Sequence, residues 1–305
     1  MCGITGCFGN HSFSKKMINS VLKSMSHRGP DGDGFIFRKL NGHNLSFFHT
    51  RLAIIDLHKH SSQPFIKDKL VLVFNGEIYN FIELRCELKK LGHSFKTYSD
   101  TEVVLEAYRA WGKNCVKRFE GMWSLAILDQ YQGFLWLSRD RFGEKPLYLW
   151  NCNGLLLFAS EVKTLAVMAG KWPKVNTNQI HRYLVNGFRS IYKKNITWFN
   201  DVQELPSSTN AIIYNPFKII RSRYWELKYD PIDMSIDDAI AGIRERLVQS
   251  VKVRLRADVP IAFCLSGGVD SGTLASIASK EFQQKIHTFS IIDKDPRYNE
   301  NTEIN

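Results

Sequence analysis

The sequence lacks a long apolar run, a basic stretch followed by an apolar region at its start, and closely spaced cysteines. No apolar run approaches the roughly 18 residues that a membrane-spanning helix needs, and the N-terminus does not read as a signal peptide. The six cysteines form no CxxC pair and no metal-ligand spacing. Scattered cysteines in a chain of this size indicate reduced thiols, so we expect a cytoplasmic protein without a membrane partner.

Long blocks of basic residues are also missing, although the net charge is +11. Residues 231–305 hold 9 Lys and Arg against 11 Asp and Glu, so the positive excess lies in residues 1–230. The basic residues there gather only in pairs such as Lys15-Lys16. A solvated basic surface explains this pattern better than nucleic-acid binding, which stays the weaker alternative.

The composition is that of a globular protein, and 305 residues suffice for one large or two ordinary domains. Residue patterns predict strands over 35–38, 45–49, 70–74, 123–129, 133–138, 146–150 and 155–159, and helices over 80–91 and 99–111. Further along, a short helix over 178–185 and a strand over 211–214 are expected. Many strands with a pair of helices favour an α+β layered fold over a βαβ repeat.

Cys2 directly follows the start methionine, so removal of Met1 would make it the N-terminal residue. A free α-amine titrates at about 7.7–8.0 and a thiol at about 8.5. The amine could therefore take the thiol proton near neutral pH, directly or through a water. Taken alone, Cys2 is better explained as an arbitrary small residue; the rest of the chain makes it a candidate nucleophile.

The apolar run 70–74 predicts a buried strand that stops at Asn75-Gly76-Glu77. A side-chain amide and a backbone N–H side by side at that point could stabilise an oxyanion. A plain hairpin turn is the alternative, because Asn-Gly is a common turn pair.

Two charged residues are candidate substrate contacts. Arg51 is predicted to begin an apolar strand over 51–57, where its guanidinium could fork onto a carboxylate or be a surface charge. Asp100 or Ser99 is predicted to cap the helix that follows. The glycine-rich stretch 26–34 is predicted to form turns.

A second chemical signal lies near the C-terminus. The spacing of apolar residues predicts a long helix over 236–256, and a buried strand over 259–265 then runs into Ser-Gly-Gly-Val-Asp-Ser at 266–271, with a helix beginning by Thr273. A strand, a glycine-rich turn and a helix N-terminus form a phosphate cradle. The usual P-loop lysine is missing, and a generic glycine turn is the alternative. The next strand is expected over 286–292.

Eight stretches resemble the N-terminal domain of the class II glutamine amidotransferases, which are N-terminal-nucleophile hydrolases. Within that class the chain is most similar to the glutamine-hydrolysing asparagine synthetases of the bacterial B type. The stretches are Met1–Ile4, His27–Asp31, Arg51–Asp56, Asn75–Asn80, Asp100–Glu102, Phe119–Met122, Arg139–Gly143 and Ala159–Lys163. The resemblance implies four layers: helices, two antiparallel sheets, and helices.

The resemblance also implies roles for these residues. Cys2 would be the nucleophile, Asn75 and Gly76 the oxyanion hole, Arg51 the contact for the glutamine α-carboxylate, and Glu77 and Asp100 the acids around its α-amine. The remaining glutamine-binding residues would be Leu52, Ala53, Ile54 and Ile55. The 266–271 loop is similar to that of ATP pyrophosphatases, which implies ATP contacts from Leu265, Ser266, Gly267, Gly268, Asp270, Ser271 and Ile291, with Mg²⁺ neutralising the departing pyrophosphate.

The implied organisation is an amidotransferase domain over 1–200, a connecting segment over 201–235, and the first part of an α/β parallel-sheet ATP-pyrophosphatase domain over 236–305. Glutamine would supply ammonia to aspartate activated by ATP, giving asparagine, glutamate, AMP and pyrophosphate. Amidation of another acid, such as a sugar acid, and a non-catalytic glutamine-binding module stay open as alternatives. A homodimer is expected, and so is a longer gene product, because few residues follow the loop at 266–271.

Overall fold

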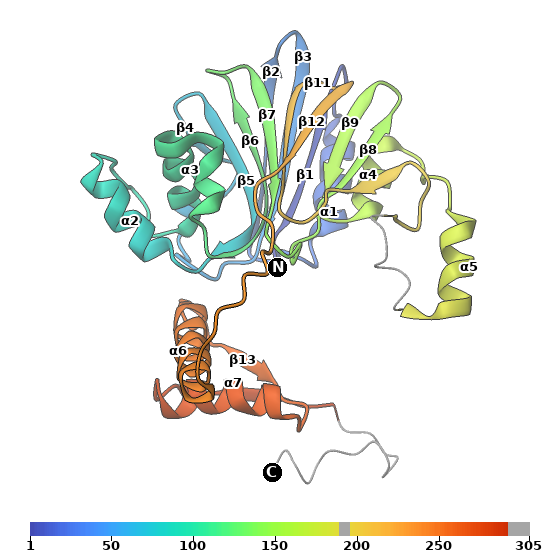
Figure 1. The fold of residues 1–305 in the computed structure, drawn as a ribbon. Helices are drawn as coiled ribbons and strands as arrows, with labels where there is room; N and C mark the ends of the chain where they lie inside the picture. The colour runs from blue at the N-terminus through green and yellow to red at the C-terminus, as the bar shows by residue number, and fades with distance from the viewer. Residues whose placement is uncertain (189–195, 292–305) are drawn as a thin grey trace. The chain divides into compact units, whose positions relative to one another are not determined.

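The computed structural model describes residues 1–188 and 196–291 (Figure 1). The chain divides into two compact units, Met1–Leu227 and Lys228–Asn305. Within the described residues no helix is both long and apolar enough to cross a membrane.

The first unit is built on two six-stranded antiparallel sheets. One sheet has the order β10-β8-β9-β1-β3-β2 and the other β12-β11-β7-β6-β5-β4. The strands are β1 Gly3–Phe8, β2 Gly32–Leu40, β3 His43–Arg51, β4 Phe65–Lys67, β5 Leu70–Ile78, β6 Gly121–Asp129, β7 Phe134–Arg139, β8 Tyr148–Cys152, β9 Leu155–Ala159, β10 Val202–Glu204, β11 Thr209–Asn215 and β12 Lys218–Arg223. The α-helices of this unit are α1 Lys15–Met25, α2 Phe81–Lys90, α3 Asp100–Trp111, α4 Val162–Ala169 and α5 Thr177–Asn186, and two short 3₁₀ helices cover Lys59–Ser61 and Gly112–Lys117.

The two sheets pack face to face, with helices on both outer faces (Figure 1). The inner faces share one apolar core, to which Phe8 and Phe158 contribute from one sheet and Val73 and Leu137 from the other. Helices α2 and α3 pack on the outer face of the second sheet, and α1 and α4 on that of the first. The predicted α+β fold with four layers is therefore confirmed.

Two local predictions around β3 are wrong. Arg51 ends a strand instead of beginning one, because β3 pairs with β1 and β2 up to its last residues, with Gly3 opposite Thr50 and Gly32 opposite Arg51. The chain turns after Arg51, and Asp56 takes a left-handed φ of 55°. The predicted turn over 26–34 ends early, since β2 already begins at Gly32.

The predicted stop at Asn75-Gly76 is also wrong. Strand β5 continues through both residues to Ile78 and pairs with β6 throughout, with Gly76 opposite Trp123. A Cβ at Gly76 would lie 2.1 Å from the Met122 carbonyl oxygen. Glycine is therefore needed here for the close approach of two strands, and it makes no turn.

The second unit contains α6 Ile236–Arg254, β13 Ala262–Cys264, α7 Val269–Lys280 and β14 His287–Phe289. β13 and β14 pair in parallel, with Phe263 opposite Thr288. A parallel pair with a helix between its strands is the start of an α/β sheet, as predicted. Residue 292, the end of the predicted last strand, lies outside the described residues.

Candidate active site

One narrow pocket brings most of the predicted glutamine residues together. Its wall contains eight of them: Cys2, Arg51, Leu52, Ile54, Ile55, Gly76, Glu77 and Asp100. The other wall residues are Gln63, Phe74, Ser99 and Thr101. The pocket volume is about 20 Å³, which holds about one water.

Cys2 lies at the start of β1, against the loop that follows β3. Its Sγ accepts a hydrogen bond from the Leu52 N–H at 3.4 Å and lies 3.6 Å from the Leu52 carbonyl oxygen. Burial raises the pKa of the Cys2 thiol to about 11, against the effect of the Leu52 hydrogen bond. With Met1 attached, the sulfur is therefore a protonated thiol at neutral pH.

The stretches His27–Asp31 and Ala159–Lys163 meet beside the backbone of Cys2. The Arg28 Nε donates to the Cys2 carbonyl oxygen at 2.9 Å, and its Nη1 donates to Glu161 at 3.0 Å. Glu161 also contacts His27 at 2.9 Å and Lys163 at 3.1 Å. Arg28 and Glu161 are thus site residues that sequence reasoning did not assign, and their shared signal was membership of the His27–Asp31 and Ala159–Lys163 stretches.

Arg51 is buried at the end of β3, where the loop after the strand folds around its guanidinium. Nη1 donates to the His58 carbonyl oxygen at 2.8 Å and Nη2 to that of Asp56. Both of these contacts are backbone carbonyl oxygens of the loop that follows β3. Ala53, which does not line the pocket, is held from outside by Asp31, whose Oδ2 accepts its N–H at 2.8 Å.

One edge of β5 presents a row of backbone N–H groups. The Phe74 N–H donates to Gln63 at 2.6 Å and the Ile78 N–H to Asp100 at 3.0 Å. Trp123 lies opposite Gly76 in β6. Its N–H donates to the Asp140 carboxylate and its carbonyl oxygen accepts from the Asp140 N–H. Gly76 and Trp123 therefore do not exchange hydrogen bonds. The alternation of an antiparallel pair then points the Gly76 N–H to the same edge as those of Phe74 and Ile78.

Asn75 lies one residue away, fully buried and outside the pocket wall. Its Nδ2 donates to Ser124 Oγ at 3.4 Å, while its Oδ1 is buried with no partner among the described residues. Nδ2 and Oδ1 of an amide are interchangeable by rotation about χ2. The side-chain amide of Asn75 thus has one long contact among the described residues.

Two acids stand together in the wall, and their burial changes their titration. Burial and then the charge of Asp100 raise the pKa of Glu77 well above its ordinary value, with Lys145 opposing the rise. Burial also raises the pKa of Asp100 to about 6, although the hydrogen bond from Ile78 lowers it. Lys145 is also buried, and its charge acts on Glu77. It is therefore a third site residue that sequence reasoning missed. The pair suits a cationic partner such as an α-ammonium group.

The predicted phosphate loop joins the end of β13 to the start of α7. Gly267 has a left-handed φ of 75°, which favours glycine, and Gly268 is the N-cap of α7. The Ser271 hydroxyl ties the loop together through the Ser266 N–H at 3.2 Å and the Gly268 carbonyl oxygen at 3.1 Å. The Leu265 N–H bonds to the Phe289 carbonyl oxygen, and Ile291 is fully exposed. Exposed N–H groups at a helix start are suited to bind phosphate.

Comparison with protein families matches both parts of the chain. Residues 1–225 match the family described as Glutamine amidotransferase domain, and residues 242–304 the family described as Asparagine synthase. Asparagine synthetase (glutamine-hydrolyzing) 1 of Bacillus subtilis is 33% identical over 95% of this chain and 46% of its own length. Asparagine synthetase (glutamine-hydrolyzing) 3 of the same organism is 31% identical over 95% of this chain and 48% of its own length. The chain spans about half the length of these relatives.

Solved structures share the fold at low sequence identity. The glutamine phosphoribosylpyrophosphate amidotransferase of B. subtilis matches with a TM-score of 0.54 at 17% identity, over 96% of this chain and 67% of that one. A structure described as the allosteric regulatory enzyme of purine biosynthesis matches with a TM-score of 0.55 at 18% identity, over 96% and 66%. These likenesses agree with the two antiparallel sheets and their covering helices.

Proposed function

Because this chain belongs to the glutamine amidotransferase domain family, we propose that it hydrolyses glutamine at Cys2 and passes the ammonia to a carboxylate activated by ATP. The observation that carries the proposal is the single pocket in which Cys2, Arg51, Gly76, Glu77 and Asp100 meet. A zwitterionic amino acid needs one cation and one or two anions at separate points, and this wall contains both.

The proposed chemistry begins once Met1 is removed and the α-amine of Cys2 takes the thiol proton. The sulfur attacks the side-chain amide carbon of glutamine, and the negative charge that develops on the amide oxygen is stabilised by the Gly76 N–H and the Asn75 amide. The C–N bond breaks, ammonia leaves with the transferred proton, and a thioester remains on Cys2. Water then hydrolyses the thioester, releasing glutamate and restoring the thiol.

Arg51 would bind the glutamine α-carboxylate, and Glu77 with Asp100 would bind its α-amine. Leu52, Ile54 and Ile55 would contact the aliphatic part of the substrate as wall residues. Ala53 would act through its backbone, because it lies behind the wall. An α-ammonium between the two acids would favour their ionised forms and offset the pKa rise caused by burial.

The loop at 266–271 supports ATP as the second substrate. Its backbone N–H groups and serine hydroxyls fit phosphate oxygens. Within residues 1–188 and 196–291 no three acidic, histidine or cysteine side chains are grouped to hold a metal alone, so Mg²⁺ would bind together with the phosphates. Asp270 in the first turn of α7 is the acidic side chain available there. Mg²⁺ would neutralise the departing pyrophosphate.

Aspartate is the acceptor that we propose, giving asparagine, and the names of the B. subtilis relatives support this choice. We also place the protein in the cytoplasm, where ATP is available. The six cysteines, all free in the structure, agree with a reducing compartment.

Alkylation of the nucleophile by a glutamine analogue tests the glutaminase half. The full chain is incubated with 6-diazo-5-oxo-norleucine, and peptide mass spectrometry locates the adduct. An adduct is expected on Cys2 and none on Cys86, which is exposed. Cys2→Ala should abolish glutamate release from glutamine, and Cys86→Ala should leave it unchanged. Hydrolysis that survives in Cys2→Ala would overturn the proposal. ATP–pyrophosphate exchange over a panel of carboxylates, with the full-length gene product, tests the acceptor.

We propose a homodimer that pairs along the open edge of β2. The two-residue turn at Asn41-Gly42 pairs Leu40 with His43, so the odd-numbered residues 33–39 direct their backbone groups to the edge. In an antiparallel pairing of two copies centred on Ile36, each Asp33 faces the partner copy's Lys39 and each Phe35 faces its Phe37. Opposite charges and aromatic pairs across strands are both favourable.

A charge swap tests this dimer by light scattering of the full chain. Asp33→Lys should weaken the dimer, because it places two lysines opposite each other. Adding Lys39→Asp to it should restore the dimer. A monomeric unsubstituted chain, or a dimer insensitive to Asp33→Lys, would contradict this edge.

A further inference from the structure

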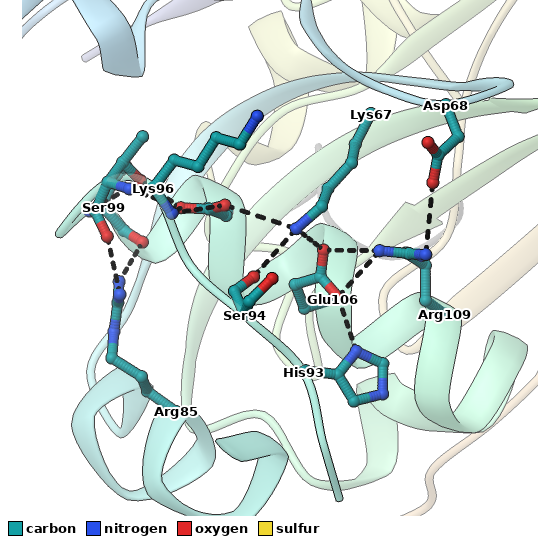
Figure 2. Close-up of polar contacts among 11 residues, drawn as sticks. Lys67, Asp68, Arg85, His93, Ser94, Lys96, Ser99, Glu106 and Arg109 are labelled. Atoms are coloured by element: carbon teal, nitrogen blue, oxygen red, sulfur yellow. Dashed lines mark hydrogen bonds and ion pairs between the residues drawn. The ribbon is translucent and has the colours of Figure 1, made fainter.

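The loop 93–99 between α2 and α3 is held in place by side chains from three elements. Arg85 of α2 forks onto two of its carbonyl oxygens, that of Thr97 at 2.6 Å and that of Ser99 at 2.9 Å, and Figure 2 shows Arg85 reaching up to Ser99. Glu102 of α3 is buried and accepts the N–H groups of Lys96 at 3.0 Å and Thr97 at 2.7 Å. Backbone atoms of this loop therefore have fixed positions.

Lys67 of β4 adds a third contact, since its Nζ donates to the Ser94 carbonyl oxygen at 2.9 Å (Figure 2). Lys67 also pairs with Glu106, a buried carboxylate that His93 contacts at 2.5 Å. The loop ends at Ser99, the N-cap of α3, and the next residue is Asp100 of the pocket wall. The position of Asp100 thus depends on how loop 93–99 is held.

A second loop, over 52–58, meets the first through Asp56. The Asp56 carboxylate accepts the Tyr98 N–H at 2.8 Å and the His58 N–H at 3.2 Å, and His60 Nε2 lies 2.9 Å from it. The carbonyl oxygen of the same residue accepts from the Arg51 guanidinium. One buried aspartate therefore touches Arg51 on one side and the loop that carries Asp100 on the other.

We propose that Asp56 is a positioning residue that fixes the separation between Arg51 and Asp100, and so sets specificity for a substrate with both an α-carboxylate and an α-amine. The inference rests on the proposed glutaminase function and deepens it. Asp56 itself does not line the pocket. It acts through its carbonyl on the carboxylate-binding arginine and through its carboxylate on the backbone that leads into α3.

The chemistry of the side chain fits this role. Burial opposes ionisation of Asp56, but the hydrogen bonds around it outweigh burial and hold its pKa at about 2. An ionised carboxylate has acceptor sites for several donors, whereas an asparagine offers one oxygen and an NH₂ group that cannot accept. Asp56→Asn keeps the shape and tolerates the left-handed φ of 55°. It must weaken at least one of the contacts to Tyr98, His58 or His60.

Asp68 is the matched control, because it also has a φ of 55°. Its side chain is 52% exposed and pairs with Arg109 at 3.2 Å, away from the pocket wall (Figure 2). Asp68→Asn therefore repeats the same chemical change in the same backbone conformation and removes an exposed ion pair, while Glu106 keeps its contacts with Arg109, Lys67 and His93.

Kinetics of the full chain test the role. Asp56→Asn should raise the KM for glutamine about ten- to a hundredfold with kcat within a few fold, as expected for a lost bond to a charged group. The preference in kcat/KM for glutamine over its analogue lacking the α-amine should fall by a similar factor. Asp68→Asn should change neither. An active Asp56→Asn with unchanged KM and unchanged preference would overturn the inference.

Hydrogen exchange tests the link without relying on activity. The Tyr98 amide or the His58 amide should exchange at least tenfold faster in Asp56→Asn than in the unsubstituted chain, because one of the two loses its acceptor oxygen, with no change in Asp68→Asn. Unchanged exchange at both amides in Asp56→Asn would overturn the link through Asp56 by itself. An unsubstituted chain that hydrolyses no glutamine would instead overturn the proposed function.

Discussion

Gly76→Ala should both destabilise the first unit and slow glutamine hydrolysis. The added Cβ would lie 2.1 Å from the Met122 carbonyl oxygen and 2.8 Å from the Trp123 Cα, both backbone atoms of the neighbouring strand β6. Trp123 is held by Asp140 through both its N–H and its carbonyl oxygen, and β6 pairs with β7 from Ser124 onward, so this part of β6 resists displacement. Overpacking of this kind costs about 1–3 kcal/mol.

For a unit of about this size each kcal/mol lowers Tm by roughly 2–4 °C, so a decrease of about 2–12 °C is expected. Displacement of β5 would also move the Gly76 N–H, and a misplacement of about 1 Å can slow catalysis roughly a hundredfold. Gly32→Ala is the control, because Gly32 also lies in a strand but a Cβ there has no atom within 4 Å. It should change Tm by at most about 2 °C.

The measurements are thermal unfolding followed by circular dichroism and the kcat for glutamate release. If Gly76→Ala had the same Tm as Gly32→Ala and kept its kcat, the close contact between β5 and β6 would not constrain the fold. The assignment of the Gly76 N–H as an oxyanion donor would then lose its main structural support.

Four further outcomes are expected. Arg51→Lys should raise the glutamine KM strongly in steady-state kinetics, because an ammonium does not replace a bidentate fork; an unchanged KM would exclude Arg51 as the carboxylate contact. Asn75→Ala should lower kcat about 100- to 1,000-fold, and an effect confined to KM would refute its oxyanion role. Alkylation of Cys2 in the chain that keeps Met1 should accelerate about tenfold per pH unit up to about pH 11, where its pKa lies; a plateau near pH 8.5 would show that burial does not raise the pKa. A chain ending at residue 227 should give a soluble, cooperatively unfolding product, whereas one ending at residue 200 should aggregate, because it lacks β10–β12 and opens the edge of β7; equal solubility would contradict this.

The chemistry-bearing residues were easier to predict from sequence than their local structure. Short stretches around Cys2, Arg51 and Asp100 indicated one amino-acid site, and the structure brings these three residues into one pocket. The secondary structure around these residues was harder to predict, since the end of a strand and the start of a strand look alike in sequence. The strands that pair with β3, which are β1 and β2, decide that question, and they are distant in the chain.

The misreading at Asn75-Gly76 has a similar cause. Local turn preference favours Asn-Gly in a hairpin, but the pairing of β5 with β6 overrides it, and the glycine is required by the Met122 carbonyl oxygen. Arg28 and Lys145 were not predicted as site residues, because no local sequence pattern marks a cation as buried. Their roles depend on Cys2 and Glu77, which the fold alone places next to them. By contrast, the loop at 266–271 combines strand, turn and helix within a few residues, so local pattern sufficed.

The contact between Arg28 and the Cys2 carbonyl oxygen bears on the proposed removal of Met1. Arg28 binds the carbonyl oxygen of Cys2, which is on the C-terminal side of that residue. The pairing of Gly3 with Thr50 holds the next residue. Neither contact uses an atom that cleavage removes. The Cys2 sulfur therefore has its position while Met1 is still attached, and the removal of Met1 that we propose would change the chemistry at the chain end and leave both contacts in place.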